Sequence, residues 1–334
     1  MAPGINLLVQ LVNELRAALP GREVKGIFSG SRNRTVSEDI TVLSMDSLDK
    51  VDPDLVQLIL VDEPHALAAP SRILKFATFK KARIYGVGAT LDGRFDGADK
   101  VLTGLIGPVL VKKTFREAVA EGAICDIKVF MVRVPFQPWK CYDRMQAYKT
   151  LIYKNREFFD LVREISMRCI PQEWQTLIFI DQISQADIMG QWIDDSVLAI
   201  ASKMTPTQRE TKFNDMVANR TKRCISTSIY AQGVTFPDIR VIINAAGGGG
   251  AITSTQKPGR LAQVRPGKKC GYMIDFLFEP ILPTEQAHDP ESRRRAYDAA
   301  WGAVVIDSKN RLRKYQSNGY QIQIVKNIEE IEVE

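Results

Sequence analysis

The sequence has few of the residues that build disulfide frameworks and metal centres. It contains five cysteines and two histidines among 334 residues. No two cysteines form a C-x-x-C pair, and their odd number and wide spacing argue against both a disulfide scaffold and a structural zinc site. We therefore expect buried free thiols in a reducing compartment. The cysteines are Cys125, Cys141, Cys169, Cys224 and Cys270.

The sequence also lacks a targeting leader and a membrane span. No charged-then-apolar leader opens the chain, and no apolar run approaches the length of a membrane-spanning helix. We therefore expect a soluble protein of the cytoplasm. Apolar residues make up 45% of the chain and charged residues 25%, as in an ordinary globular protein. The net charge of +6 and the pI of about 9.0 favour a polyanion such as nucleic acid as partner.

Short strands alternate with helices in the first part of the chain. Apolar residues at helical spacing predict an amphipathic helix over residues 6–19, which Pro20-Gly21 ends. The strands predicted after it are Val24–Phe28, Ile40–Leu43, Leu58–Val61 and Ile84–Val87. Strands that alternate with helices in this manner are typical of a parallel sheet with helices on both faces.

The same alternation returns later and predicts a second parallel-sheet domain, as the length of the chain also suggests. Its predicted strands are Ile127–Val134, Thr176–Ile180, Val197–Ala201, Arg223–Thr227 and Arg240–Asn244. Its predicted helices are Tyr142–Cys169, Ala186–Ile193 and Pro206–Val217. We place the first domain at residues 1–122, the second at 123–280 and a C-terminal extension at 281–334. That extension is predicted to hold a basic helix and two short strands, Ala303–Asp307 and Gln321–Val325.

One acidic motif follows a buried strand. Leu58–Val61 runs directly into Asp62-Glu63-Pro64-His65, the D-E-x-H pattern of a nucleoside triphosphatase, in which the first carboxylate holds Mg²⁺ and the second polarises water. Such an enzyme should also carry a G-x-x-x-x-G-K-[ST] loop that cradles the phosphates. The chain has a single Gly-Lys pair, Gly267-Lys268, and Ala262 stands where the first glycine should be. The sequence shows no such loop.

Further motifs follow the acidic box in a fixed order. Gly88-Ala89-Thr90 follows a strand, Thr227 begins a segment that runs through Gln232-Gly233-Val234, and Gln256-Lys257-Pro258-Gly259-Arg260 opens a helix. In this order, the motifs resemble the motor of superfamily 2 helicases, particularly the compact DNA helicases and translocases of tailed phages. The resemblance covers residues 1–280. It implies an α/β fold with two RecA-like parallel-sheet domains, the first of them truncated at its N-terminus.

The resemblance also implies a set of site residues, with ATP and Mg²⁺ as cofactors. Asp62 would hold the metal, Glu63 would orient water, and His65 and Arg260 would complete the catalytic group. The residues that would bind nucleotide are Gln256, Gly259 and Arg265. The residues that would touch nucleic acid, DNA rather than RNA, are Thr90, Thr227, Gly233, Arg293 and Arg294. If a phage encodes the protein, its location would be the host cytoplasm.

The chain departs from the family pattern at several positions. The family's strand, Walker A loop and helix precede the point where this chain begins. Gln263 stands where the family has an arginine finger, Pro64 replaces a small residue, and Leu91 stands where proline is common. Because arginine fingers contribute about 10³–10⁵ in rate, autonomous ATP hydrolysis is not expected.

Three functions stay open on the sequence. The chain could be part of a split helicase motor, a pseudo-helicase that binds a partner or DNA without hydrolysing ATP, or a degenerate fragment. Because residues 1–20 supply one helix but no replacement strand, we expect a protein partner or a second copy to cover the truncated domain. We expect no membrane partner.

Overall fold

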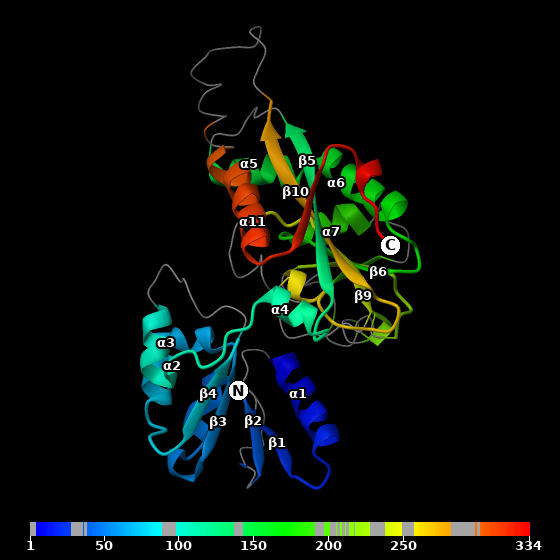
Figure 1. Ribbon diagram of the computed structural model, residues 1–334. Coiled ribbons are helices and arrows are strands. Elements are labelled where there is room, and N and C mark those ends of the chain that lie inside the picture. Colours follow the sequence, from blue (N-terminus) through cyan, green and yellow to red (C-terminus); the bar gives the residue numbers. More distant parts are fainter. Residues whose placement is uncertain are drawn as a thin grey trace. The chain divides into compact units, whose positions relative to one another are not determined.

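The computed structural model describes most of the chain (Figure 1). The described residues are 5–27, 36, 39–88, 98–136, 143–190, 197–200, 205, 208, 211, 214–216, 218–227, 238–248, 257–281, 298 and 301–334. They divide into two compact units: Met1–Lys112 with Gln232–Val234, and Lys113–Ala231 with Thr235–Glu334. Each unit is an α/β structure with parallel strands.

The first unit holds two small parallel sheets among its described residues. One sheet pairs β1 (Val24–Ile27) with β2 (Ile40–Leu43), and the other pairs β3 (Leu58–Asp62) with β4 (Arg83–Val87). The predicted strands are therefore confirmed in place. The helical segments are α1 (Ile5–Ala18), η1 (Met45–Lys50), η2 (Pro53–Leu55), η3 (Pro64–Ala68), α2 (Pro70–Phe76) and α3 (Ala98–Ile106).

Two apolar clusters hold the first unit together. In the smaller cluster, Leu8 and Val12 of α1 pack against Val24 and Val42 of the β1–β2 sheet. The larger cluster covers one face of the β3–β4 sheet and includes Ile59, Val61, Phe76 and Leu102. The other face of that sheet is open, because Leu58 and Leu60 are 54% and 58% exposed. Its remaining apolar side chains are the exposed Tyr85 and Val87.

The second unit is built on a seven-stranded parallel sheet of order β11-β5-β10-β9-β6-β8-β7. The strands are β5 (Asp126–Phe136), β6 (Gln175–Phe179), β7 (Val197–Ile200), β8 (Arg223–Ser226), β9 (Ile239–Asn244), β10 (Cys270–Pro280) and β11 (Gln321–Val325). The helical segments are α4 (Phe115–Ala120), α5 (Arg144–Tyr148), η4 (Lys149–Tyr153), α6 (Arg156–Glu164), η5 (Ile165–Cys169), α7 (Ile183–Gly190), η7 (Trp301–Val305), α11 (Ile306–Ser317) and η8 (Ile328–Glu330). The predicted RecA-like α/β architecture is confirmed.

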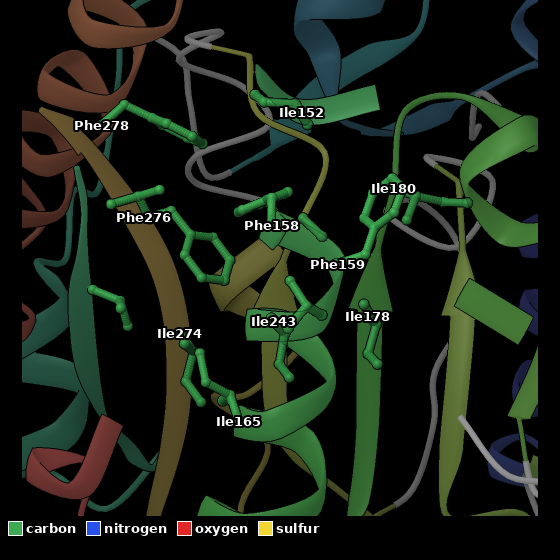
Figure 2. Packing of buried hydrophobic residues seen from close by; sticks show 14 of the residues in the cluster. Ile152, Phe158, Phe159, Ile165, Ile178, Ile180, Ile243, Ile274, Phe276 and Phe278 are labelled. Atoms are coloured by element: carbon green, nitrogen blue, oxygen red, sulfur yellow. The ribbon is translucent and has the colours of Figure 1, made fainter. Parts of the chain in front are cut away.

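One large apolar core fills the second unit. Figure 2 shows Phe158 and Ile165 of the α6–η5 segment directed at side chains of neighbouring strands, among them Phe276 and Ile243. The rings of Phe158 and Phe276 meet edge to face, with 4.8 Å between their centroids. Aromatic pairs prefer this geometry, which adds about 0.5–1.5 kcal/mol to the area that they bury.

The sequence-based prediction differs from the structure at several places in the second unit. Residues Ala303–Asp307, predicted as a strand, are helical and lie in η7 and the start of α11. Ala303, Val304 and Val305 are all buried, and a short apolar run cannot be assigned to strand or buried helix from its pattern alone. The long strand β10 was not predicted at all. Among the described residues, no helix is long and apolar enough to cross a membrane.

The predicted long helix from Tyr142 to Cys169 is broken once within its described part. Asn155 ends the first segment and begins the second, because its side chain accepts a hydrogen bond from the backbone N–H of Phe158 at 3.2 Å. Asparagine is among the preferred N-cap residues, and it favours a helix start over a helix interior. The predicted helix Pro206–Val217 and the helix with Arg293, Arg294 and Arg295 lie largely outside the described residues.

Candidate functional site

The acidic box lies where strand β3 ends. Asp62 is the last residue of β3 and is paired with Val87 of β4. Glu63 follows in the left-handed region, with φ 51°, and its N–H donates to the Val87 carbonyl at 2.9 Å. This conformation is uncommon for a residue with a side chain, and such residues gather at functional sites. The turn sets two consecutive carboxylates at the carboxyl end of a parallel strand pair, where α/β proteins commonly bind ligands.

The surroundings of Asp62 disfavour its negative charge. Burial raises the pKa of the Asp62 carboxyl, and the neighbouring Glu63 charge raises it further. A bound cation would relieve both effects, so the donor chemistry fits a hard divalent ion. Mg²⁺ is commonly held by one or two carboxylates, with waters and substrate phosphates completing the shell. In the part of the chain that the structure describes, no cluster of three or more histidine, cysteine or acidic residues could hold a metal by itself.

His65 lies close to the second carboxylate of the box. Its Nδ1 is 3.1 Å from Glu63 Oε2, and both side chains are largely shielded from water. An imidazole at this distance restricts the directions in which the carboxylate can point. The arrangement thus places one carboxylate suited to a cation beside a second that packs against an imidazole ring.

Pro64 fits the box because of a glycine on the neighbouring strand. A Cβ atom on Gly86 of β4 would lie 3.0 Å from Pro64 Cγ, which is closer than ordinary contacts allow. Pro64 is buried and occupies the first position of η3, where its missing N–H costs nothing. Its departure from the family pattern is therefore matched by a neighbour that makes room for the ring.

The second unit carries the remaining described site residues on two elements. Thr227 directly follows β8, and its carbonyl accepts a hydrogen bond from Ser226 Oγ at 2.8 Å. Gly259 and Arg260 lie in a tight turn in which the Arg260 N–H donates to the Lys257 carbonyl at 3.2 Å. Arg265 is exposed shortly after that turn. The predicted residues Gln256, Thr90, Gly233, Arg293 and Arg294 lie outside the described residues.

Gln263 is held by the core of its unit. Its backbone carbonyl accepts a hydrogen bond from Cys125 Sγ at 3.2 Å. Its side-chain Oε1 is buried and has no hydrogen-bond partner among the described residues. A glutamine in such a place cannot supply the fixed positive charge of an arginine finger.

Sequence reasoning missed a buried polar network in the second unit. Asp275 is fully buried in β10 and receives two hydrogen bonds from Arg311 of α11, at 2.8 and 2.9 Å. The signal for it was visible, because a lone carboxylate inside the apolar run Gly271–Phe278 must find a partner. The partner, 36 residues away in the sequence, was not identifiable from pattern.

Comparisons with known proteins find similarity to helicases, in the second unit above all. Residues 157–264 match the model of the helicase conserved C-terminal domain. "Putative helicase 22" of the Sulfolobus islandicus filamentous virus (isolate Iceland/Hveragerdi) is 20% identical over 254 residues, which are 69% of this chain and 44% of that protein. The chain thus spans less than half the length of this viral relative.

Solved helicases share the fold of the chain. S. cerevisiae Dbp5 bound to RNA and ADP BeF3 matches with a TM-score of 0.61 and 13% identity, over 98% of this chain and 76% of that one. The Mycobacterium smegmatis helicase Lhr bound to ssDNA and AMP-PNP matches with a TM-score of 0.56 and 15% identity, over 97% and 43%. At these identities the likeness shows the fold alone.

Proposed function

We propose that the chain is a superfamily 2 helicase-like protein of the DExH type that binds nucleic acid and is part of, or derived from, an ATP-dependent viral DNA helicase. The observation that carries this proposal is the pairing of a helicase C-terminal domain at residues 157–264 with consecutive carboxylates at the end of β3. Neither feature alone is specific, because acidic pairs after strands are common in unrelated proteins.

In this proposal, ATP and Mg²⁺ are the cofactors and the acidic box is the catalytic end of the site. Asp62 holds the metal, Glu63 orients the attacking water and His65 positions Glu63. Arg260 stabilises charge on the nucleotide. The other residues that bind nucleotide are Gln256, Gly259 and Arg265. Binding is impaired, because the chain carries no G-x-x-x-x-G-K-[ST] loop to cradle the phosphates.

Nucleic acid, DNA in preference to RNA, is the proposed polymer. Thr227 at the end of β8, together with Thr90 and Gly233, would contact the phosphate backbone, and Arg293 and Arg294 would add positive charge. The net charge of +6 supports contacts of this kind, which carry little sequence information. DNA is chosen on the sequence resemblance, and the solved helicases of this fold include complexes with RNA and with DNA.

We further propose a cytoplasmic protein whose first unit is covered by a second polypeptide, either a partner or another copy. The exposed Leu58, Leu60, Tyr85 and Val87 on one face of the β3–β4 sheet support this, since exposed apolar patches mark interaction surfaces. Sedimentation at micromolar concentration, with and without dye that reports apolar surface, tests it. A monodisperse monomer that binds no such dye would rule out the partner.

The alternative is a catalytically inactive pseudo-helicase that serves as a binding or regulatory module. Gln263 at the finger position favours it, because this residue carries no positive charge.

Steady-state ATP hydrolysis in the presence of DNA tests whether the chain alone turns over ATP. We expect turnover by the chain to equal that of its Glu63→Gln variant, which keeps the shape of the side chain but cannot polarise water. Turnover that this substitution abolishes would contradict the inactive module and favour an intact motor. Both functions require contacts with DNA phosphates. DNA affinity measured between low and moderate salt tests these contacts, because log affinity should fall steadily with log salt. A salt-independent isotherm would exclude phosphate contacts.

A further inference from the structure

The turn that carries Arg260 is tied to the C-terminal helix by a continuous chain of buried polar contacts. The chain begins at Lys257, the first residue of the turn, whose Nζ donates to Asn244 Oδ1 at 2.8 Å. Asn244 is the last residue of β9, and its Nδ2 donates to Asp275 Oδ2 at 3.1 Å. Asp275 in turn receives the guanidinium of Arg311, which lies on α11. Each link is a direct hydrogen bond between described side chains.

Every member of this chain is withdrawn from water. Lys257, Asn244, Asp275 and Arg311 are each no more than 5% exposed. The Lys257 ammonium also lies 5.1 Å from the centroid of the Phe179 ring. In such surroundings a broken hydrogen bond is not replaced by water, so loss of one member leaves a buried polar group without its partner.

Arg311 also contacts the backbone of the segment that follows β9. Its Nη1 donates to the Gly248 carbonyl at 2.7 Å, just after β9. The Gly248 N–H donates to the hydroxyl of Tyr148 at 3.2 Å. The preceding Gly247 has φ 72°, and a Cβ there would lie 2.6 Å from Ile152 Cδ1, so a residue with a side chain would be strained at this position. The backbone after β9 is therefore fixed on both sides, by Arg311 and by Tyr148.

The C-terminal helix is itself anchored by a second acidic residue. Asp307, in the first turn of α11, accepts hydrogen bonds from the Tyr148 hydroxyl and from Arg144. Tyr315, a further turn along α11 from Arg311, donates to Asp275 Oδ2 at 2.7 Å. Helix α11 thus contacts β10 through Arg311 and Tyr315, and α5 through Asp307, by polar side chains rather than by apolar packing alone.

We propose that α11 is a positioning element for the Lys257–Arg260 turn, and that Arg311 is its principal residue. Arg311 fixes Asp275, Asp275 fixes Asn244, and Asn244 fixes Lys257, so that the backbone of Arg260 is held in one place. If the Arg311–Asp275 pair had no further role, it would stabilise the whole unit. Its loss would then affect the Lys257–Arg260 turn no more than other segments. That Arg260 then acts on nucleotide rests on the proposed function, whereas the positioning itself does not.

Hydrogen exchange of the full chain tests the positioning directly. The N–H groups of Arg260, Leu261 and Ala262 donate to the carbonyls of Lys257, Pro258 and Gly259. In Arg311→Met these amides should exchange at least about tenfold faster than in the wild type, the loss expected for a hydrogen bond to a charged group. Arg311→Lys, which keeps the charge, should restore part of the protection.

A buried arginine outside the network provides the matched control. Arg223 is 1% exposed and donates to Ser166 and to the carbonyl of Trp174. Arg223→Met should destabilise the unit without selective loss of protection at residues 260–262. Equal loss in both variants, or none in Arg311→Met, would overturn the proposal. If Arg311→Met fails to fold, Asn244→Ala serves instead, because it cuts the Lys257 link and leaves the Arg311–Asp275 pair in place.

Titration with a fluorescent ATP analogue and Mg²⁺ examines the step that depends on the proposed function. Arg311→Met should lower affinity in the wild-type background and have no further effect beside Arg260→Ala, because the two act through one group. Additive losses would overturn the link between α11 and Arg260. Absence of binding by the wild-type chain, together with the expected exchange result, would defeat the nucleotide site and leave the positioning role standing.

Discussion

The two units use similar apolar strands but bury them differently. In the second unit every residue of β6 and of β8 is buried, as expected for parallel strands covered by helices on both faces. In the first unit the wholly apolar Leu58–Val61 alternates, so that Ile59 and Val61 are buried while Leu58 and Leu60 are exposed. An apolar run therefore predicts a strand, but the number of covered faces depends on neighbours that the run does not encode.

Charged groups follow the same division. The first unit forms ion pairs at its surface, such as Arg72 with Asp46 at 2.9 Å and Lys75 with Asp49 at 3.0 Å. The second unit buries Asp275 and Arg311 completely and surrounds them with further donors. Surface pairs contribute little to stability, whereas removal of one member of a buried pair is costly.

The largest effect should come from separating the units. Residues 113–334, expressed alone, should unfold in one cooperative transition, because their sheet and core are complete. Residues 1–112 should show no cooperative transition, since two-stranded sheets are marginal in water unless more surface is buried. Circular dichroism during heating measures both. A sharp transition for residues 1–112 would remove the difference between the units.

The next largest effect should come from removing one member of an ion pair in each unit. Asp275→Ala leaves the Arg311 guanidinium buried without its carboxylate, and should lower the free energy of unfolding of the second unit by about 3–5 kcal/mol. Asp46→Ala, at the exposed pair with Arg72, should change stability by no more than about 1 kcal/mol. Urea titration gives both values. Comparable losses in the two variants would mean that burial does not determine how much these ion pairs contribute to stability.

Two neighbours on β3 test the burial of the first unit. Ile59→Ala removes a side chain that is 6% exposed and should cost about 2–5 kcal/mol, whereas Leu60→Ala, on the open face, should cost no more than about 0.5 kcal/mol. Urea unfolding of the full chain, monitored by hydrogen exchange in each unit, measures the loss of stability that each substitution causes. A large loss for Leu60→Ala would show that the open face is covered in solution, and self-association would then fall with the same substitution.

Alkaline pH should affect the second unit through Lys257. Burial lowers the pKa of the Lys257 ammonium from 10.5 to about 8. Between these values the unfolded chain holds the proton more firmly than the folded one, so this group's contribution to folding stability rises with pH across that window. The rise is at most about 3 kcal/mol.

Lys257→Met should remove that rise while leaving the change that comes from Lys268, whose pKa burial also lowers to about 8. Urea titrations at a series of alkaline pH values measure the difference between wild type and variant. An unchanged pH dependence in Lys257→Met would mean that the folded lysine is not desolvated.

Local patterns made much of the fold predictable from the sequence. The acidic box was found because an apolar strand ends in Asp62-Glu63, and β4, β8 and β9 because short apolar runs lie between turn residues. β10 escaped notice because Asp275 interrupts its apolar run, and its partner Arg311 lies on α11, a helix that was not predicted. Contacts between residues far apart in the chain are not visible in any local pattern.

Strand order has a consequence for how the second unit is made. β5 is its first strand, yet its two neighbours in the sheet, β10 and β11, are its last two. During synthesis the fully apolar centre of β5 emerges long before either neighbour. Its pairing with β10 must wait until Cys270–Pro280 has left the ribosome, and its other edge stays unpaired until Gln321–Val325 follows. Pairing over such sequence separations is slow, and exposed strand edges invite aggregation. We therefore expect the nascent chain to expose the unpaired edges of β5 until its neighbours arrive, and slower synthesis to lengthen that exposure.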